Sequence, residues 1–238
     1  MFIKKIIVSA ISIFFMISQI QTQSFIGAWE GHSTADSGAS QKSVVIFSDG
    51  YQVLTTYDSE TGKFISTNGG TWNIEDDTMT EVVEFDSANP DRVGSELSFK
   101  VHIDGTKMGI VGSDIVMLRI DDGTPGALHG AWLMSGRIRN GKTQSRDVNR
   151  PRKTMKILSG TRFQWIAYNT ETKEFKGTGG GTYTTADGKY TENIEFFSKD
   201  NSKVGRNLSF NYELLTGDWH HTGLSSKGDP IHEIWSVR

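Results

Sequence analysis

An internal repeat constrains the fold of this chain more than any other feature. Residues 49–99 and 160–210 align without a gap at a spacing of 111 residues, and about 19 of the 51 aligned positions are identical. A period this long does not suit a solenoid repeat or a propeller blade, but it matches the size of a small domain. The chain is therefore expected to contain two copies of one domain. The identical positions include Tyr57/Tyr168, Phe64/Phe175, Gly70/Gly181, Glu81/Glu192 and Phe85/Phe196.

Each copy consists of short runs of alternating polarity, separated by turns rich in Gly, Asp, Asn and Ser, which is typical of antiparallel strands. The pattern predicts strands near 26–33, 41–47, 50–57, 63–73, 79–86, 94–103, 107–112 and 114–120, and again near 130–137, 152–158, 161–168, 174–184, 189–197, 205–214, 217–224 and 230–238. Eight sequential strands lose their exposed edges by closing into an up-and-down barrel. We expect an all-β protein of two tandem eight-stranded antiparallel barrels, at 24–122 and 129–238, joined by a linker at 123–128.

The amino terminus has the form of a secretory signal peptide. Lys4 and Lys5 precede a mostly apolar run at 6–20, and a polar exit follows. We expect cleavage near Gln23 and export to the periplasm or the cell exterior; the alternative is a retained membrane anchor. The chain has no cysteine, which excludes disulfides and thiolate chemistry, and its formal charge of -3 gives no nucleic-acid signal.

Strand parity predicts which side chains fill the barrels, because successive side chains alternate across a sheet. On the fifth strand of each copy it places a mostly apolar set inside: Met79, Glu81, Val83 and Phe85, with Tyr190, Glu192, Ile194 and Phe196 in the second copy. The glycine runs at 69–70 and 179–181 lie in mid-strand, where glycine usually marks a sharp bend or a bulge.

Both copies open with Gly-x-Trp, at Trp29 and Trp132, and both end with an arginine on the last strand, Arg119 and Arg238. This pattern resembles the lipocalin and wider calycin family. The resemblance covers nearly all of the chain after the signal segment, and it implies that each arginine packs over its tryptophan to close one barrel end. It also implies the carriage of small hydrophobic molecules. The chain departs from typical lipocalins in having no helix after the barrel and no disulfide, and it is most similar to lipocalin-like domains of bacterial exported proteins.

The second lumen is predicted to be the more aromatic one, and we place the candidate ligand site there. Its residues are Phe163, Trp165, Tyr190, Glu192, Phe210 and Tyr212. Aromatic walls stack apolar ligands, although they also simply fill barrels. A carboxylate inside a barrel must be paired or protonated, so Glu192, with Tyr190 beside it, is also a candidate general acid or base. The alternative is a structural carboxylate satisfied by a neighbour, and Glu81 has the same two interpretations.

A histidine group and a basic segment are two further candidate sites. His220, His221 and His232 are poorly arranged for a metal, because adjacent residues on a strand point to opposite faces; we predict no metal site and no cofactor. The segment 137–153 carries seven Arg and Lys against Asp147 alone. If it forms a loop over the barrel mouth, as in calycins, it could select an anionic ligand; the alternative is a solvated loop.

Three functions follow from these observations. The first is an exported protein that binds a small, partly apolar ligand in a barrel lumen, with an anionic group favoured by the basic segment. The second is an enzyme that uses Glu192 as general acid or base on a small molecule or glycan. The third is a structural or interaction module of the cell envelope with filled barrels. Membrane contact is expected only through an uncleaved signal segment.

Overall fold

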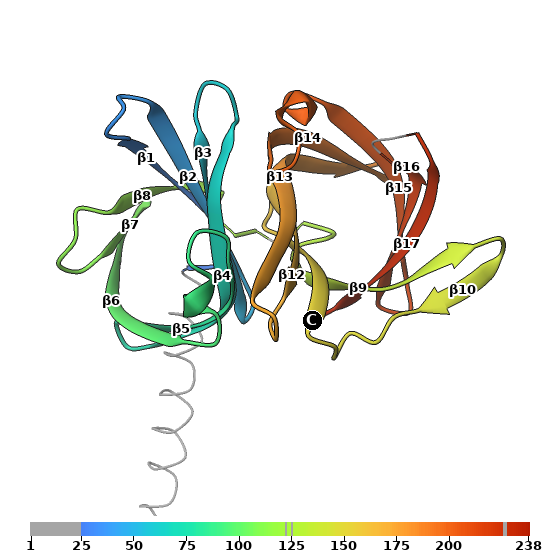
Figure 1. The fold of residues 1–238 in the computed structure, drawn as a ribbon, viewed down its shortest axis with the longest axis horizontal. Coiled ribbons are helices and arrows are strands. Elements are labelled where there is room, and N and C mark those ends of the chain that lie inside the picture. The colour runs from blue at the N-terminus through green and yellow to red at the C-terminus, as the bar shows by residue number, and fades with distance from the viewer. Residues whose placement is uncertain (1–24, 122, 125, 226–227) are drawn as a thin grey trace, which may run out of the picture.

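The protein forms two closed antiparallel barrels that lie side by side (Figure 1). The computed structural model describes residues 25–121, 123–124, 126–225 and 228–238. The first barrel contains β1 (Gly27–Thr34), β2 (Ser40–Ser48), β3 (Tyr51–Asp58), β4 (Phe64–Glu75), β5 (Thr78–Asp86), β6 (Glu96–Asp104), β7 (Lys107–Ile110) and β8 (Val116–Asp121). Pairing of β1 with β8 closes it. The predicted all-β fold is thus confirmed.

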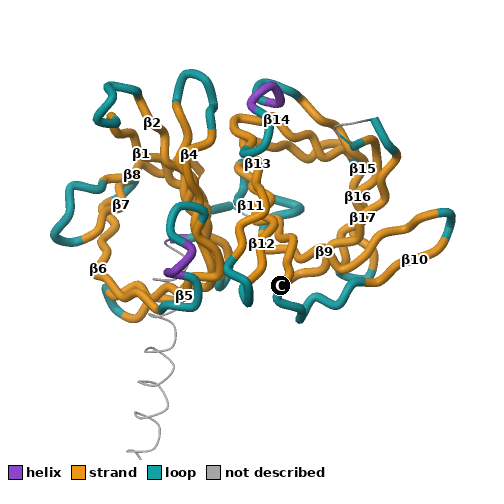
Figure 2. The backbone as a smooth tube through the Cα atoms, viewed as in Figure 1, coloured by secondary structure: helices purple, strands orange, loops and turns teal. Residues whose placement is uncertain are grey.

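The second barrel repeats this plan and adds one strand. It contains β9 (Gly130–Arg139), β11 (Arg152–Leu158), β12 (Arg162–Asn169), β13 (Glu174–Ala186), β14 (Lys189–Phe197), β15 (Asn207–Leu215), β16 (Asp218–Leu224) and β17 (Pro230–Val237), and pairing of β9 with β17 closes it. Single 3₁₀ turns, η1 (Pro90–Arg92) and η2 (Asn201–Lys203), follow β5 and β14 (Figure 2).

The extra strand corrects the expectation of a long basic loop. β10 (Lys142–Ser145) pairs with the extended end of β9, because Asn140 and Gly141 have the positive φ that a tight hairpin turn requires. This hairpin projects outward from the second barrel in Figure 1. The signal-peptide prediction at 1–23 lies outside the described residues. Within the described ranges, no helix has the length and hydropathy needed to cross a membrane.

A bulge in β5 and β14 changes which face the last residues of these strands use. Gly69 pairs with Phe85 and Gly70 with Val83, so that one residue, Glu84, is left over; the second copy leaves Glu195 in the same way. A Cβ at Gly70 would lie 1.9 Å from the Val82 carbonyl oxygen, so only glycine permits this bend. The predicted inward position of Phe85 and Phe196 is wrong, because the extra residue turns both rings outward into the core between the barrels.

The predicted closure of each barrel end holds for the first copy alone. The Arg119 guanidinium lies 3.9 Å from the centre of the Trp29 ring, and it donates a hydrogen bond to the Ile26 carbonyl oxygen at 3.0 Å. In the second copy the residue that pairs with Trp132 across the sheet is Val237. Arg238 is the next residue, so its side chain lies on the opposite face of the sheet from Trp132. Its guanidinium contacts Glu84 of the first barrel instead, and Trp132 packs edge-on against Trp219.

At the interface between the barrels, equivalent residues of the two copies make the same contact in both directions, each tyrosine bonding to a glutamate of the other barrel. The Tyr57 hydroxyl donates to Glu195 at 2.6 Å, and the Tyr168 hydroxyl donates to Glu84 at 2.6 Å. At the centre, Phe64 stacks on Phe175, its equivalent in the other copy, with the two planes 11° apart. The two halves are thus related by an approximate two-fold axis. Buried apolar residues of both barrels fill the space around these pairs, among them Val44, Ile46, Val53, Met155, Ile157 and Ile166.

Candidate functional site

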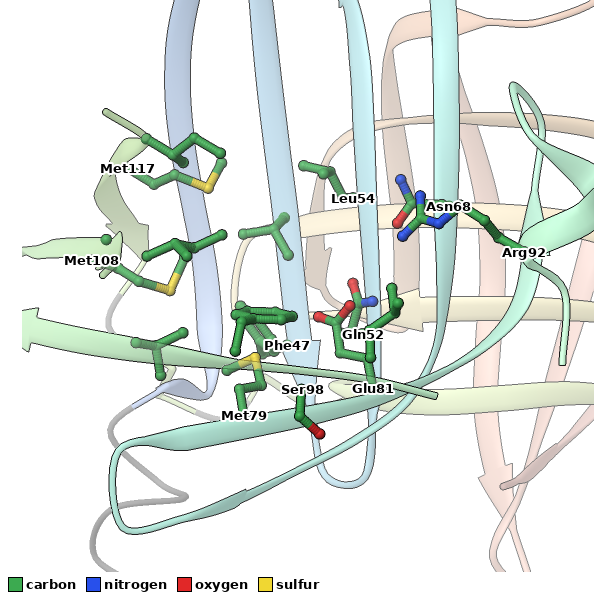
Figure 3. Close-up of a pocket in the computed structure, with 17 residues that line it drawn as sticks. Phe47, Gln52, Leu54, Asn68, Met79, Glu81, Arg92, Ser98, Met108 and Met117 are labelled. Carbon is green, nitrogen blue, oxygen red and sulfur yellow. The ribbon is translucent and has the colours of Figure 1, made fainter. Parts of the chain in front are cut away.

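A cavity of about 430 Å³ occupies the lumen of the first barrel (Figure 3). Phe47 lines the cavity and makes an edge-on contact with the buried ring of Phe25, which in turn contacts Trp72 edge-on. Arg92 and Ile115 belong to the β5–β6 and β7–β8 connections, which emerge at one rim of an up-and-down barrel. Ile115 is 52% exposed, so the cavity reaches solvent there. Its size falls in the range of small-molecule sites in proteins.

The cavity has one apolar wall and one polar end. Figure 3 shows the thioethers of Met79, Met108 and Met117 on one side and the polar groups of Gln52, Asn68 and Glu81 on the other. Methionine is flexible and polarisable, so a wall of three methionines adapts to ligands of different shape. Further apolar lining comes from Val45, Phe47, Leu54, Leu97, Phe99 and Val101.

The polar end has unused hydrogen-bonding capacity. Among the described residues, the side chains of Gln52, Asn68 and Glu81 have no hydrogen-bond partner, although Gln52 is only 3% exposed. Burial raises the pKa of the Glu81 carboxyl to about 7, and the positive charge of Arg92 opposes this rise. Arg92 is itself held by Asp86, at 2.8 Å. Gln52 is buried, Asn68 and Glu81 are half-buried, and all three line the cavity, so their hydrogen-bonding groups are available to a ligand.

Aromatic side chains crowd the described part of the second lumen, where the sequence placed the ligand. The structure brings the six predicted residues together. Phe163, Tyr190 and Phe210 are buried in one cluster with Trp132, Trp219 and Trp235, and Trp165 and Tyr212 pack against this cluster. Tyr190 contacts Phe163, Phe210 and Trp219. Burial and the nearby Glu192 carboxylate raise the pKa of the Tyr190 hydroxyl well above its usual value.

Glu192 is paired with a lysine that the sequence analysis did not single out. The ammonium of Lys156 lies 2.8 Å from Glu192, and both side chains are almost fully buried. The same ammonium lies 4.8 Å from the centre of the Tyr190 ring, 4.9 Å from that of Trp219 and 5.3 Å from that of Trp235. The ion pair with Lys156 agrees with the alternative in which Glu192 is a structural carboxylate satisfied by a neighbour. A lysine in the apolar run 155–158 was the signal that could have revealed it.

Comparison of the two copies explains why the first lumen has more space among its described side chains than the second. At a spacing of 111 residues, Val45 corresponds to Lys156, Met79 to Tyr190, and Met108 to Trp219. Leu54 and Gln52 similarly correspond to Trp165 and Phe163, and strand pairing matches Met117 with Trp235. Each position carries a smaller or more flexible side chain in the first copy, and Glu81 retains the carboxylate without the lysine.

The histidines divide between two faces, as expected from strand alternation. His220 Nδ1 and His232 Nε2 are 3.0 Å apart, whereas His221 points into the barrel and contacts Glu233 at 3.2 Å. Burial and the charge of Lys156 lower the pKa of His221. No three ligating side chains converge on a possible metal position within the described residues.

The basic hairpin of β9 and β10 carries a small hollow of about 240 Å³, and Met134, which lines it, also packs against the aromatic cluster of the second barrel. Arg137 and Arg146 line it, and the Arg137 guanidinium donates to Gln144 at 2.8 Å. Its positive charges face this hollow and the solvent, so they act on a different part of the molecule from the cavity of the first barrel.

Comparison with known proteins adds one finding. The sequence at 127–237 matches a family described as a domain of unknown function, DUF4488. No curated protein matches the chain. The matched segment coincides with the second barrel, so this half of the chain is similar to a family whose description names no activity.

Proposed function

We propose that this is an exported, lipocalin-like binding protein that takes a small, partly apolar molecule into the lumen of its first barrel. The observation that carries the proposal is the polar end of the cavity. There, Gln52, Asn68 and Glu81 offer donors and acceptors that no neighbouring side chain uses. A ligand with a polar group at one end and an apolar body satisfies both halves of this site.

The shape of the barrel supports the same conclusion. The walls of the cavity come from strands that the β1–β8 closure and the core between the barrels hold in place, so the site is largely preformed. Binding to a preformed site is tighter, because little entropy is lost in ordering the side chains that line it. The rim beside Ile115 gives an entry path, and the flexible methionines let the apolar wall adapt to the ligand.

The second barrel serves in this proposal as a filled partner that supports the first. Its lumen is occupied by Trp219, Trp235 and the Lys156–Glu192 pair. The anionic ligand expected from the basic segment would bind at the β9–β10 hairpin rather than in a lumen. Export rests on the signal-like amino terminus.

Exchange of residues between the two copies tests where the ligand binds. Met108→Trp and Met79→Tyr introduce the residues that fill the second lumen, and they should abolish binding of an environment-sensitive apolar fluorophore to the full protein. Tyr190→Phe in the second barrel is the matched control and should leave binding unchanged. Melting temperatures establish that all variants are folded.

Two results would count against the proposal. Loss of binding in second-barrel variants alone would place the ligand among Phe163, Trp165, Tyr190 and Glu192. Failure of the parent protein to bind the fluorophore, or any member of a panel of lipids, phenols and sugars, would leave the structural module as the better explanation. Turnover of a bound compound that Glu81→Gln abolishes would instead favour an enzyme.

A further inference from the structure

The two barrels present the same carboxylate in the same surroundings. Glu81 pairs across the sheet with Trp72 and Leu97, and Glu192 pairs with the equivalent Tyr183 and Leu208. The positions facing these carboxylates also correspond. Val45 lies between Trp29 and Leu54, just as Lys156 lies between Trp132 and Trp165. The second barrel therefore shows which group fits beside this glutamate.

In the second barrel that group is an ammonium ion on an apolar stem. Lys156 reaches Glu192 at 2.8 Å, and its charge lies among aromatic rings. This geometry satisfies two needs of a buried ammonium ion, an anionic partner and polarisable neighbours. The butyl stem of the lysine crosses the apolar part of the lumen.

In the first barrel the chain supplies the carboxylate but not the ammonium. Val45 is too short to reach Glu81, and the aromatic rings are replaced by Met79, Met108 and Met117. The space that the lysine stem and the rings fill in the second barrel contributes to the cavity of about 430 Å³. Soft thioether sulfurs remain as polarisable neighbours for a charge.

We infer that the ligand of the first barrel is an organic amine, whose ammonium group pairs with Glu81 and whose apolar body packs against the methionine wall. The inference rests on the proposed function of this cavity. The oxygens of Gln52 and Asn68 lie at the same end and can accept the remaining N–H groups. The ligand amine thus takes the place that Lys156 holds in the other copy.

The neighbouring positive charge does not prevent this pairing. Arg92 lines the cavity, but its guanidinium is engaged by the buried carboxylate of Asp86 at 2.8 Å. Among the described residues that line the cavity, Glu81 and Arg92 are the ionisable ones. With Asp86 included, the local charge is -1 when Glu81 is ionised, and a single ammonium ion neutralises it.

A matched series of ligands tests the inference. Hexylamine, 1-hexanol and hexanoate share one apolar body and differ in the polar group. Their affinities for the full protein are measured by calorimetry at pH 8, where Glu81 and the amine are both ionised. We expect hexylamine to bind at least about ten-fold more tightly than hexanol, because it makes a charge-assisted hydrogen bond, and hexanoate to bind most weakly.

Variants decide whether Glu81 causes this preference. Glu81→Gln should reduce hexylamine affinity to that of hexanol while hexanol affinity stays within about two-fold. Val45→Lys should place a lysine against Glu81 and abolish amine binding, whereas Val45→Met, of similar length without charge, should retain the preference. If Val45→Lys does not fold, the comparison of Glu81→Gln with Val45→Met is sufficient.

The outcomes separate the inference from the proposed function. Equal binding of the three compounds, or an amine preference that survives in Glu81→Gln, would overturn the inference and leave a cavity that binds apolar molecules. Failure of all three compounds and of the apolar fluorophore to bind would overturn the proposed function itself. Loss of the preference in Glu81→Gln, with hexanol binding intact, would support both.

Discussion

Replacement of Glu81 by glutamine should change how the stability of the protein depends on pH. In the folded state, burial raises the pKa of this carboxyl from 4.5 to about 7. The folded protein therefore holds the proton more tightly than the unfolded chain does. Between pH 4.5 and about 7 folding takes up a proton, so this group lowers the free energy of unfolding progressively as the pH rises through that window. Above it the penalty is complete and constant.

The size of the penalty follows from the pKa difference. A rise from 4.5 to about 7 corresponds to roughly 3 kcal/mol, which is an upper value because solvent reaches the cavity through its rim. Glutamine has the same shape and carries no charge. Glu81→Gln should therefore equal the parent within about 0.5 kcal/mol at pH 4 and exceed its stability by up to about 3 kcal/mol at pH 8.

Urea unfolding at pH 4, 5, 6, 7 and 8, followed by tryptophan fluorescence, measures this difference. Comparing the variant with the parent at each pH cancels the contributions of the other ionisable groups. Glu96→Gln, which removes an exposed carboxylate from the neighbouring strand β6, is the control and should give a small difference at every pH. A parent–variant difference that is constant with pH, or larger at pH 4 than at pH 8, would refute the assignment of Glu81 as an unpaired buried acid.

Three further perturbations test other parts of the structure. Glu192→Gln should lower the free energy of unfolding in urea by about 3–5 kcal/mol, because it removes the carboxylate paired with the buried Lys156 ammonium. A Lys156→Met, Glu192→Leu double variant that is no more stable than Glu192→Gln would contradict this explanation. Gly181→Ala should prevent formation of the native second barrel, since its Cβ would lie 2.0 Å from a backbone carbonyl oxygen; an unchanged melting temperature would show that the bulge is dispensable. Arg238→Met should cost about 1–3 kcal/mol, because it removes the positive charge paired with Glu84 between the barrels and leaves that carboxylate with the Tyr168 hydroxyl. A cost below about 0.5 kcal/mol would indicate that Tyr168 and solvent already satisfy Glu84.

Much of the backbone could be predicted from the sequence, because strand alternation, turn residues and an ungapped repeat are local signals. The strand order followed from them. The contact between Trp29 and Arg119 was expected from the resemblance to the lipocalin family. The positions of Phe85 and Arg238 did not, since a bulge or a one-residue shift in register moves a side chain to the opposite face. Neither event has a signature as strong as the strand pattern itself.

The candidate site was harder to predict than the fold. Whether a lumen is open depends on summed side-chain volumes across several strands, and parity says only which side chains enter it. An aromatic lumen suggested a binding wall, and there Tyr190 and Trp219 pack against each other. The difference between Val45 and the aligned Lys156 distinguishes the two lumens. Its importance can be recognised only once the structure shows that Lys156 pairs with Glu192.

The exchanged contacts of Tyr57 with Glu195 and Tyr168 with Glu84 have an evolutionary consequence. Such an isologous arrangement is what two identical single barrels would make as a symmetric homodimer, where one patch meets itself. Fusion of two such subunits into one polypeptide ends the requirement that both remain alike. One half is then free to become a rigid support while the other diverges as a receptor, and selection can tune the receptor without weakening the half that holds it in place.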